Sequence, residues 1–507
     1  MAVTKLQVGN KSDVIHILLG VFLASILIRF VTAEYLDIGG DNAAKWLYAK
    51  YLAAGIPFDY WYQQTIRWPI LFPLAGIIKL FGNNPALTYV LPILFSSIST
   101  AGICYIGIRL SGIRLGMTSA LMMLLFPLMV ETGSQLWPGI FEMTYIIVCV
   151  ICILAWLDTK SKRFLALAAL AFFLGWGSRV TIIYAYPGLI LLLWLPTRRF
   201  KGPVLFTLLV GLLCAVEWAA FWAIAGNPMG RIGIIEASHL VTAGLKISWH
   251  DYLFNIKHLV KYKGLMAVWF LCMGAAVINT RSEDMRWRGL AWIYIFYALL
   301  LFYMISSLSP LKLALPTGPR FWGVIAPMGL LLLANALLSL AEHHPRTGKT
   351  ILALVVIAFV GFTVKKIPSR NSILQTAKDY TLLRPVLADH KPVLMEYDHW
   401  QPNFIEEYVI SMFTGKKGKR IPRKDHVEMA MIRNKGRVAF LFVDDPLLAK
   451  EFTSEGTLVP EGYTLYRFTP PGSDPNERPT VLIKFGRKLH RAISLTDERA
   501  AANTPAE

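Results

Sequence analysis

The sequence has few charged residues: Asp, Glu, Lys and Arg together make up only 16% of its 507 residues. A typical globular domain contains about 25%, whereas 55% of this chain is hydrophobic. An ordinary soluble enzyme is therefore excluded. Apolar runs recur at the length that a helix needs to cross a bilayer, about 20 residues. The sequence predicts an all-α polytopic membrane protein.

Cysteine is also scarce, and all five cysteines lie inside apolar runs. The segments expected outside the membrane contain none, which excludes a disulfide framework there. Cys149 and Cys152 form a Cys-x-x-Cys pair, but within a span this is more often two small apolar residues than a redox or metal site.

Hydropathy predicts 11 membrane spans with the N-terminus in the cytoplasm. They cover about residues 14–33, 86–108, 115–131, 138–157, 164–178, 181–196, 203–225, 264–279, 289–306, 320–340 and 350–365. Residues 69–82 are apolar too, but 14 residues make a helix of only about 21 Å against about 30 Å of hydrocarbon. This segment predicts a helix lying in the outer interface.

The basic residues support this topology. The net charge is +19, and much of it lies in short loops between spans, such as the loop with Arg198, Arg199 and Lys201. When residues 69–82 are not counted as a span, each such loop falls on the cytoplasmic side, as the positive-inside rule requires. The charge therefore indicates topology signals and contacts with anionic lipid rather than nucleic-acid binding.

The chain divides into a transmembrane domain at residues 1–365, an extracytoplasmic α/β domain at 366–469, and a linker with a disordered tail at 470–507. The transmembrane domain includes a first outer loop at 34–85 and a long outer loop at 227–262. In the α/β domain we expect strands at 392–397, 438–444 and 463–468, and helices near 401–413 and 445–453. Residues 481–493 are compatible with a basic amphipathic helix.

The first outer loop carries two acidic residues, Asp37 and Asp41, directly after the first span. Acidic residues are costly to keep near hydrocarbon and are functional candidates for that reason. Asp41 suits a general base. Its alternative role is to cap the helix expected at 43–54, a position that Asp favours. Asp37 is the second candidate, with a solvated loop acid as its alternative.

The topology gathers further polar groups at the outer face. They are Lys45, Arg67, Trp68, Glu131, Gln135, Arg179, Arg231, Glu236, His239, His250, Lys312 and Arg320. Carboxylates and arginines that converge on one membrane face suit chemistry on an anionic lipid headgroup. The alternative for each arginine is an interface anchor that snorkels to the headgroups. For Glu131 it is a structural ion pair, and the two histidines lack metal-ligand spacing.

The order and spacing of these residues resemble the GT-C membrane glycosyltransferases. Their first-loop pattern is matched by Asp41, Trp46-Leu47-Tyr48-Ala49-Lys50, Leu52 and Gly55, and their Pro-Pro-Leu stretch by Arg67-Trp68-Pro69-Ile70-Leu71. Ser178-Arg179-Val180 with Pro187 and Arg320-Phe321 with Pro327 resemble two later motifs of the family. The resemblance covers about residues 14–340. The chain is most similar to the lipid A aminoarabinose transferases, the bacterial galacturonosyltransferases and the protein mannosyltransferases.

The sequence also departs from the family. Asn42 stands where a second acidic residue is usual, and one proline of the Pro-Pro-Leu stretch is replaced. The second outer loop has Pro138-Gly139 where relatives often carry an acidic residue, and its acids are Glu131 and Glu142. The chain has no Asp-x-Asp sequence, so neither a divalent metal nor another cofactor is expected.

The resemblance implies transfer of a sugar from a polyprenyl-phosphate donor to lipid A, lipopolysaccharide core or another cell-envelope glycan, usually with inversion. The reaction takes place on the extracytoplasmic face of a bacterial inner membrane. In this account Asp41, or else Asp37, accepts the proton of the acceptor hydroxyl. The donor phosphate is bound by Arg320, Arg179 and Arg67, with Lys45 and Lys312 in reserve. Other substrate-binding candidates are Glu131, Gln135, Trp68 and His239.

Two other functions remain open. A non-enzymatic lipid or polysaccharide transporter would have pseudo-symmetric halves and polar residues at mid-membrane. Here the ionisable groups lie at span ends and the two halves do not match. A glycan ligase or polymerase that uses pyrophosphate-linked donors would share the membrane side and the arginines.

Overall fold

The computed structural model describes residues 11–34, 41–58, 60, 63–242, 263–303, 305–308, 311–313 and 319–366, residues 373, 374 and 377, and short strands between 393 and 494. The chain forms two compact units. The first comprises residues 1–34, 57–73 and 89–371, and the second comprises residues 35–56, 74–88 and 372–507.

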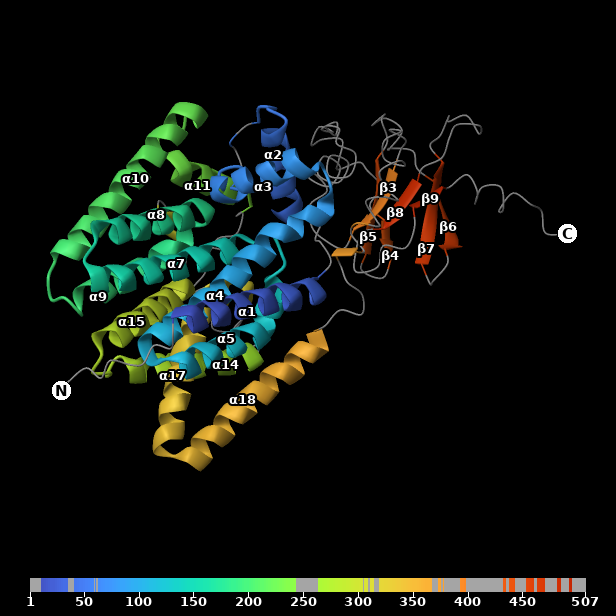
Figure 1. The fold of residues 1–507 in the computed structure, drawn as a ribbon. Coiled ribbons are helices and arrows are strands. Elements are labelled where there is room, and N and C mark those ends of the chain that lie inside the picture. The colour runs from blue at the N-terminus through green and yellow to red at the C-terminus, as the bar shows by residue number, and fades with distance from the viewer. Residues whose placement is uncertain are drawn as a thin grey trace. The chain divides into compact units, whose positions relative to one another are not determined.

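The first unit consists mainly of helices (Figure 1). Its helices are α1 (Lys11–Val31), α4 (Val90–Ser111), α5 (Ile113–Leu125), α6 (Pro127–Thr132), α7 (Pro138–Thr159), α8 (Lys162–Ser178), η2 (Val180–Ala185), α9 (Tyr186–Trp194), α10 (Lys201–Ala225), α11 (Gly230–Thr242), α14 (Lys263–Asn279), α15 (Met285–Leu300), η3 (Leu301–Tyr303), α16 (Pro319–Trp322), α17 (Ala326–His343) and α18 (Pro345–Lys366). The strands β1 (Ile305–Leu308) and β2 (Leu311–Leu313) pair antiparallel.

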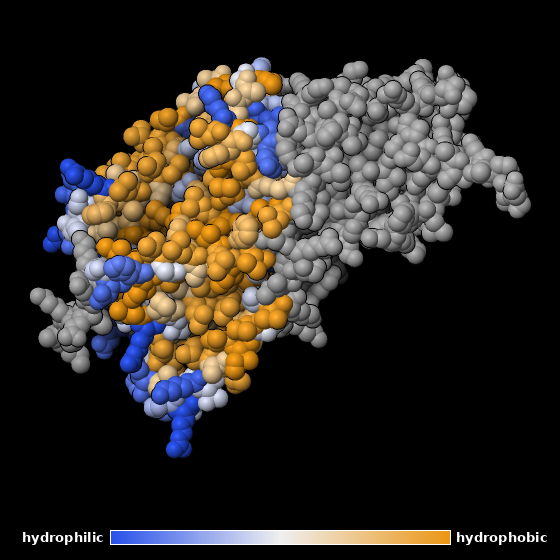
Figure 2. Space-filling model, turned by 45° about the vertical axis from the view of Figure 1, so that its right-hand side comes forward, coloured by the Kyte–Doolittle hydropathy of each residue, from blue (hydrophilic) through white to orange (hydrophobic). Residues whose placement is uncertain are grey.

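Five helical segments of the described residues are long and apolar enough to cross a membrane. They are Ser12–Val31, Pro85–Ser111, Pro138–Thr159, Lys201–Ala225 and Ala326–His343. Other apolar helices, such as Ile113–Leu125 and Gly264–Asn279, are shorter. Hydrophobic residues cover most of the described surface seen in Figure 2, and hydrophilic ones gather at its margins. The count of 11 spans stays a prediction.

Several of the expected spans are interrupted. The one expected at 115–131 is α5 followed by α6, because Phe126 is extended (φ −67°, ψ 118°) before Pro127, as the residue before a proline usually is. The one expected at 289–306 ends sooner, and Ile305–Leu308 is a strand. The one expected at 320–340 consists of α16 and α17. Phe126 is buried, as an irregular backbone at membrane depth must be.

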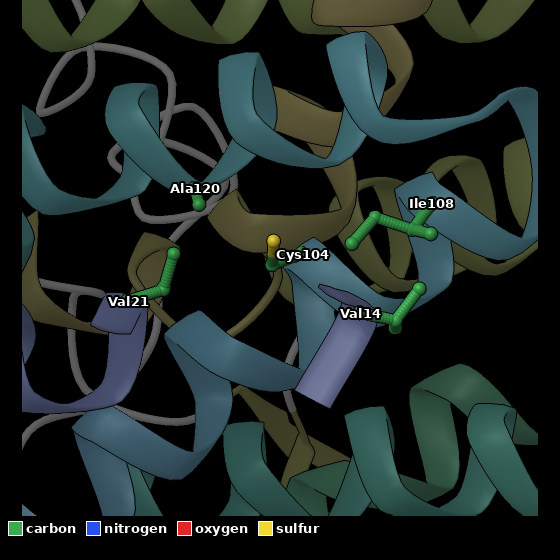
Figure 3. Packing of buried hydrophobic residues seen from close by; sticks show 5 residues of the cluster. All are labelled: Val14, Val21, Cys104, Ile108 and Ala120. Atoms are coloured by element: carbon green, nitrogen blue, oxygen red, sulfur yellow. The ribbon is translucent and has the colours of Figure 1, made fainter. Parts of the chain in front are cut away.

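Small and medium apolar side chains pack α1 against α4 and α5. The cluster contains Val14, Val21, Cys104, Ile108 and Ala120 (Figure 3). All five residues are no more than 9% exposed. Lipid is as apolar as these side chains, so close packing, rather than escape from water, favours the association of such helices.

The second unit contains α2 (Asp41–Ala53), the end of α3 (Trp68–Phe81) and η1 (Pro85–Tyr89). The helix expected at 43–54 is confirmed as α2, and the one expected at 69–82 as α3. Their location in the membrane interface stays a prediction. Within this unit Trp46 donates a hydrogen bond of 3.0 Å from Nε1 to Oδ1 of Asn83.

The C-terminal strands form a five-stranded sheet in the order β4-β5-β3-β8-β9 and a separate hairpin of β6 and β7. The strands are β3 (Val393–Tyr397), β4 (Ile432–Asn434), β5 (Arg437–Phe442), β6 (Thr453–Val459), β7 (Tyr463–Thr469), β8 (Val481–Lys484) and β9 (Ala492–Ser494). β3 pairs antiparallel with β5 and parallel with β8.

The strands expected at 392–397, 438–444 and 463–468 coincide with β3, β5 and β7. The helix expected at 401–413 lies outside the described residues, as does the one near 445–453 except for Thr453, which begins β6. The amphipathic helix expected at 481–493 is wrong at both ends, because Val481–Lys484 is the strand β8 and Ala492–Ser494 is the strand β9. Residues 485–491 lie outside the described residues. The domain limits and the α/β class stay predictions.

Gly188 provides a test of the packing between α9 and α15, which lie side by side (Figure 1). A Cβ at Gly188 would collide with the backbone of Ile293, which cannot move as a side-chain tip can. We expect Gly188→Ala to lower the free energy of unfolding in detergent by about 1–3 kcal/mol. Gly211→Ala is the matched control, because a Cβ there meets no atom within 4 Å. Equal stability of the two variants would contradict this packing.

Candidate functional site

A buried carboxylate joins three elements of the first unit. Glu142, near the start of α7, is fully buried. The hydroxyl of Tyr297 on α15 donates a hydrogen bond of 2.7 Å to its Oε1. Thr181 Oγ1 on η2 lies 2.8 Å from both carboxylate oxygens. Arg179 Nη1 lies 3.8 Å from Oε2 and completes an ion pair. The carboxylate thus holds three side chains in one arrangement.

Arg179 owes its position to a break in the helix. It follows the last residue of α8 in an extended conformation (φ −163°, ψ 129°), and the chain continues as the 3-10 helix η2. Its guanidinium carbon lies 4.1 Å from the ring centroid of Phe321 and 5.5 Å from that of Trp137. Both distances are within the range of cation–π attraction. The side chain is only 10% exposed.

A second arginine reaches the same junction. Arg67 Nη1 donates a hydrogen bond of 2.8 Å to the carbonyl of Ser178, the residue before Arg179. Arg67 Nη2 lies 3.3 Å from Oε1 of Gln63. Arg67 and Arg179 are therefore neighbours where α8 ends, although they are more than a hundred residues apart in sequence.

Arg320 is the third arginine of this neighbourhood. It belongs to α16, is exposed, and its guanidinium carbon lies 5.7 Å from the ring centroid of Phe321. The same ring contacts Arg179. The structure thus brings together Arg67, Arg179 and Arg320, the three arginines that the sequence selects for phosphate binding. Planar guanidinium groups bind phosphate in a bidentate manner, so the cluster can hold a phosphate group.

The other candidates of the first unit have different surroundings. Gln135 Nε2 donates a hydrogen bond of 3.1 Å to Glu34 Oε2. Trp68 Nε1 donates one of 2.6 Å to Glu217 Oε1. Glu131 is half-buried in α6. The described residues do not include Asp37 or the side chains of His239 and Lys312, although the backbones of these last two belong to α11 and β2.

Asp41 and Lys45 belong to the second unit. Asp41 is half-buried and is the first residue of α2. Lys45 Nζ lies 2.8 Å from the carbonyl oxygen of Asp41 and 3.4 Å from Oδ1 of Asn42. The ammonium of Lys45 is therefore turned back onto the first turn of its own helix.

Glu142 and Glu217 are not among the site residues predicted from the sequence. A signal for both exists, since each is an acidic residue within a long apolar helix, where acids are costly and usually functional. Glu131 was predicted as a site residue in the same region. In the structure it is Glu142 that contacts Arg179 and Tyr297. Among the described residues, no three His, Cys, Asp or Glu side chains are grouped so as to hold a metal.

Comparison with known proteins identifies the fold. Residues 69–222 match the model of the dolichyl-phosphate-mannose-protein mannosyltransferase family. The structure is similar to crystal structures of ArnT from Cupriavidus metallidurans. With the form bound to undecaprenyl phosphate the TM-score is 0.54 at 12% identity, covering 86% of this chain and 99% of that one. With the apo form it is 0.50 at 11% identity, covering 85% and 98%. Curated protein sequences gave no match.

These findings define a multi-pass membrane protein with the GT-C fold of membrane glycosyltransferases. Within this class the chain is similar to ArnT. The resemblance inferred from the residue motifs is thereby confirmed.

Substitutions near the two ends of α7, at Glu142 and at Asp158, test the importance of the buried carboxylate. In Glu142→Gln the neutral side chain no longer balances Arg179, and its amide N–H₂ faces hydroxyl donors. Breaking a buried ion pair from one side costs about 3 kcal/mol or more. The matched control is Asp158→Asn, about 24 Å further along α7, where the exposed pair with Arg109 contributes about 1 kcal/mol or less. Denaturant unfolding in detergent measures both; an equally small loss in the two variants would contradict the assignment.

Proposed function

We propose that this protein transfers a sugar from a polyprenyl-phosphate donor to an acceptor hydroxyl at the extracytoplasmic face of a membrane. The observation that carries this proposal is the arginine cluster at the junction of α8 and η2. Arg67 and Arg179 meet there, and Arg320 shares the ring of Phe321 with Arg179. Such a cluster at the ends of membrane helices fits the phosphate of a lipid-linked substrate.

The leaving group of the reaction is the lipid phosphate. As its bond to the anomeric carbon breaks, the electron pair stays on the phosphate oxygen and negative charge grows there. Positive groups that are already in place stabilise this charge most strongly where water is excluded. Arg179 is suited to this role because Glu142 and two aromatic rings fix it and only 10% of its side chain is exposed. Arg67 supplies a second guanidinium group whose N–H groups can donate to the phosphate.

The acceptor hydroxyl is a weak nucleophile and must lose its proton as its oxygen forms the bond to the anomeric carbon. We assign that proton to the carboxylate of Asp41, with Asp37 as the second candidate. Attack from the side opposite the phosphate inverts the anomeric centre. No metal enters this scheme, because a phosphate departs readily when guanidinium groups bind it.

The comparisons support the donor class. One similar structure is ArnT bound to undecaprenyl phosphate, and the matching family is described by its use of dolichyl-phosphate-mannose. We therefore place a lipid monophosphate at the arginines. As acceptors we propose lipid A, lipopolysaccharide core or another envelope glycan, with the protein in a bacterial inner membrane and its N-terminus in the cytoplasm.

Reconstitution tests this function directly. Purified protein in proteoliposomes should transfer sugar from a synthetic polyprenyl-monophosphate donor to an envelope glycolipid extract. Transfer only from the pyrophosphate-linked donor would favour the ligase or polymerase function. Movement of the lipid across the bilayer without any transfer would favour the transporter.

Removing either Arg67 or Arg179, both half-buried, should slow the chemistry. We expect Arg67→Ala and Arg179→Ala each to lower kcat/KM by about 10²–10³-fold, the usual loss for one preorganised charge-stabilising donor. Arg109→Ala is the control, because that arginine pairs with Asp158 at the opposite end of α7. The measurement is initial-rate transfer in proteoliposomes with protein amounts matched by gel filtration. Activity of both variants close to wild type would remove the arginines from the reaction.

Asp41→Asn separates catalysis from helix capping. In the structure Asp41 is the first residue of α2, so Asn loses only the attraction of a negative charge to the helix N-terminus, about 0.3–1 kcal/mol. The helix should remain intact, whereas an amide cannot accept the acceptor's proton. We expect a loss of transfer of about 10²-fold or more with a nearly unchanged thermal unfolding midpoint. Asp41→Ala should lose both activity and stability. Full activity of Asp41→Asn would leave capping as the function of this residue.

A further inference from the structure

A second buried carboxylate, Glu217, lies next to the residues that flank Arg67 in sequence. Glu217 on α10 pairs with Arg231 on α11, with 2.7 Å between Glu217 Oε1 and Arg231 Nη2. Arg231 Nε lies 3.1 Å from both oxygens of Glu217. The side chains are 4% exposed for Arg231 and 6% for Glu217.

Two indole N–H groups complete the contacts of this carboxylate. Trp68 Nε1 lies 2.6 Å from Oε1 of Glu217, and Trp176 Nε1 lies 2.8 Å from Oε2. Each oxygen of the Glu217 carboxylate therefore accepts hydrogen bonds from Arg231 and from one indole N–H. A buried ion pair contributes little net stability, because removing two charges from water is costly, and its best-supported role is to fix a particular arrangement.

The arrangement fixed here is the turn that carries Arg67. Arg231 Nη2 also donates a hydrogen bond of 2.7 Å to the carbonyl of Ile66. The ion pair therefore holds Ile66 through its backbone and Trp68 through its side chain, which are the residues on either side of Arg67. Arg67 itself is bonded to Ser178 on α8.

Apolar packing seals the same turn. Ile66 forms a buried cluster with Phe221 of α10 and Ile234 of α11, and Trp68 packs against this cluster. The guanidinium carbon of Arg231 lies 5.4 Å from the ring centroid of Phe221. Water is thereby kept from the ion pair, which strengthens its hydrogen bonds. The turn has little room to move unless the pair opens.

We propose that Glu217 and Arg231 are positioning residues that hold the turn at residues 63–68 and aim Arg67 at the donor phosphate. This inference rests on the phosphate role of Arg67 proposed above. It links α11, the first helix of the long outer loop, to the phosphate site. If the pair served only to join α10 to α11, the ion pair alone would be enough. Here the pair also forms hydrogen bonds with Ile66 and Trp68, the two neighbours of Arg67.

The test removes both charges together, so that no unpaired charge is left buried. The variant is Glu217→Leu/Arg231→Met, which keeps apolar bulk at both sites. The matched control is Trp176→Phe, which removes one donor to Glu217 and leaves the bonds of Ile66 and Trp68 in place. Gel filtration and thermal unfolding establish that both proteins are folded.

The first readout is hydrogen–deuterium exchange of the peptide covering residues 63–69 in nanodiscs. We expect exchange there to rise about tenfold or more in the double variant, since the opening of the turn is no longer opposed, and to stay near wild type in Trp176→Phe. Unchanged exchange in the folded double variant would overturn the proposal, whatever the activity of the protein.

The second readout is affinity for undecaprenyl phosphate. A misplaced guanidinium should weaken binding by about 10- to 100-fold in the double variant, while Trp176→Phe binds like wild type. Normal affinity despite faster exchange would show that the pair is only a structural staple. Arg67→Ala is measured in parallel. If it binds the probe normally, the phosphate role of Arg67 fails, and the exchange data still decide whether the pair holds the turn.

Discussion

The site depends on one constraint: a charge at the end of a membrane helix must be paired and hydrogen-bonded, or it is too costly to bury. Glu142 meets this constraint through Tyr297, Thr181 and Arg179. Because Glu142 lies on α7 and its partners lie on α15, on η2 and at the residue before η2, satisfying one carboxylate also fixes α7, η2 and α15 at the place where the arginines meet.

Two buried acids, Glu142 and Glu217, position Arg179 and Arg67, respectively. Glu142 forms an ion pair of 3.8 Å with Arg179 itself, whereas Glu217 acts on Arg67 indirectly, through Arg231 and Trp68. A guanidinium that is already oriented loses little freedom when it binds a phosphate, which is the advantage of preorganisation. The irregular end of α8 supplies the meeting point, since Ser178 offers its carbonyl to Arg67 and Arg179 follows it directly.

The sequence predicts that Arg67, Arg179 and Arg320 share one face of the membrane, but it does not identify Glu142 and Glu217 as buried acids nearby. The predicted topology places Arg67, Arg179 and Arg320 on one membrane face, and the structure brings them together around Phe321 and Ser178. Glu142 could be noticed as an acid within an apolar helix, but its contact with Tyr297 could not be predicted, because 155 residues separate the two and no local pattern joins them. Residues 481–493 were interpreted as a helix, because a short apolar run fits both the helical period and the strand period. In the structure Val481–Lys484 pairs with β3, and Ala492–Ser494 pairs with Val481–Lys484.

The central claim is that a lipid phosphate binds between Arg67 and Arg179. The most direct measurement is a cryo-electron microscopy structure in nanodiscs with undecaprenyl phosphate bound. The account predicts phosphate oxygens within hydrogen-bonding distance of both guanidinium groups, with Glu142 still paired to Arg179. A phosphate bound elsewhere, with Arg67 on the Ser178 carbonyl and Arg179 remote from the ligand, would contradict it.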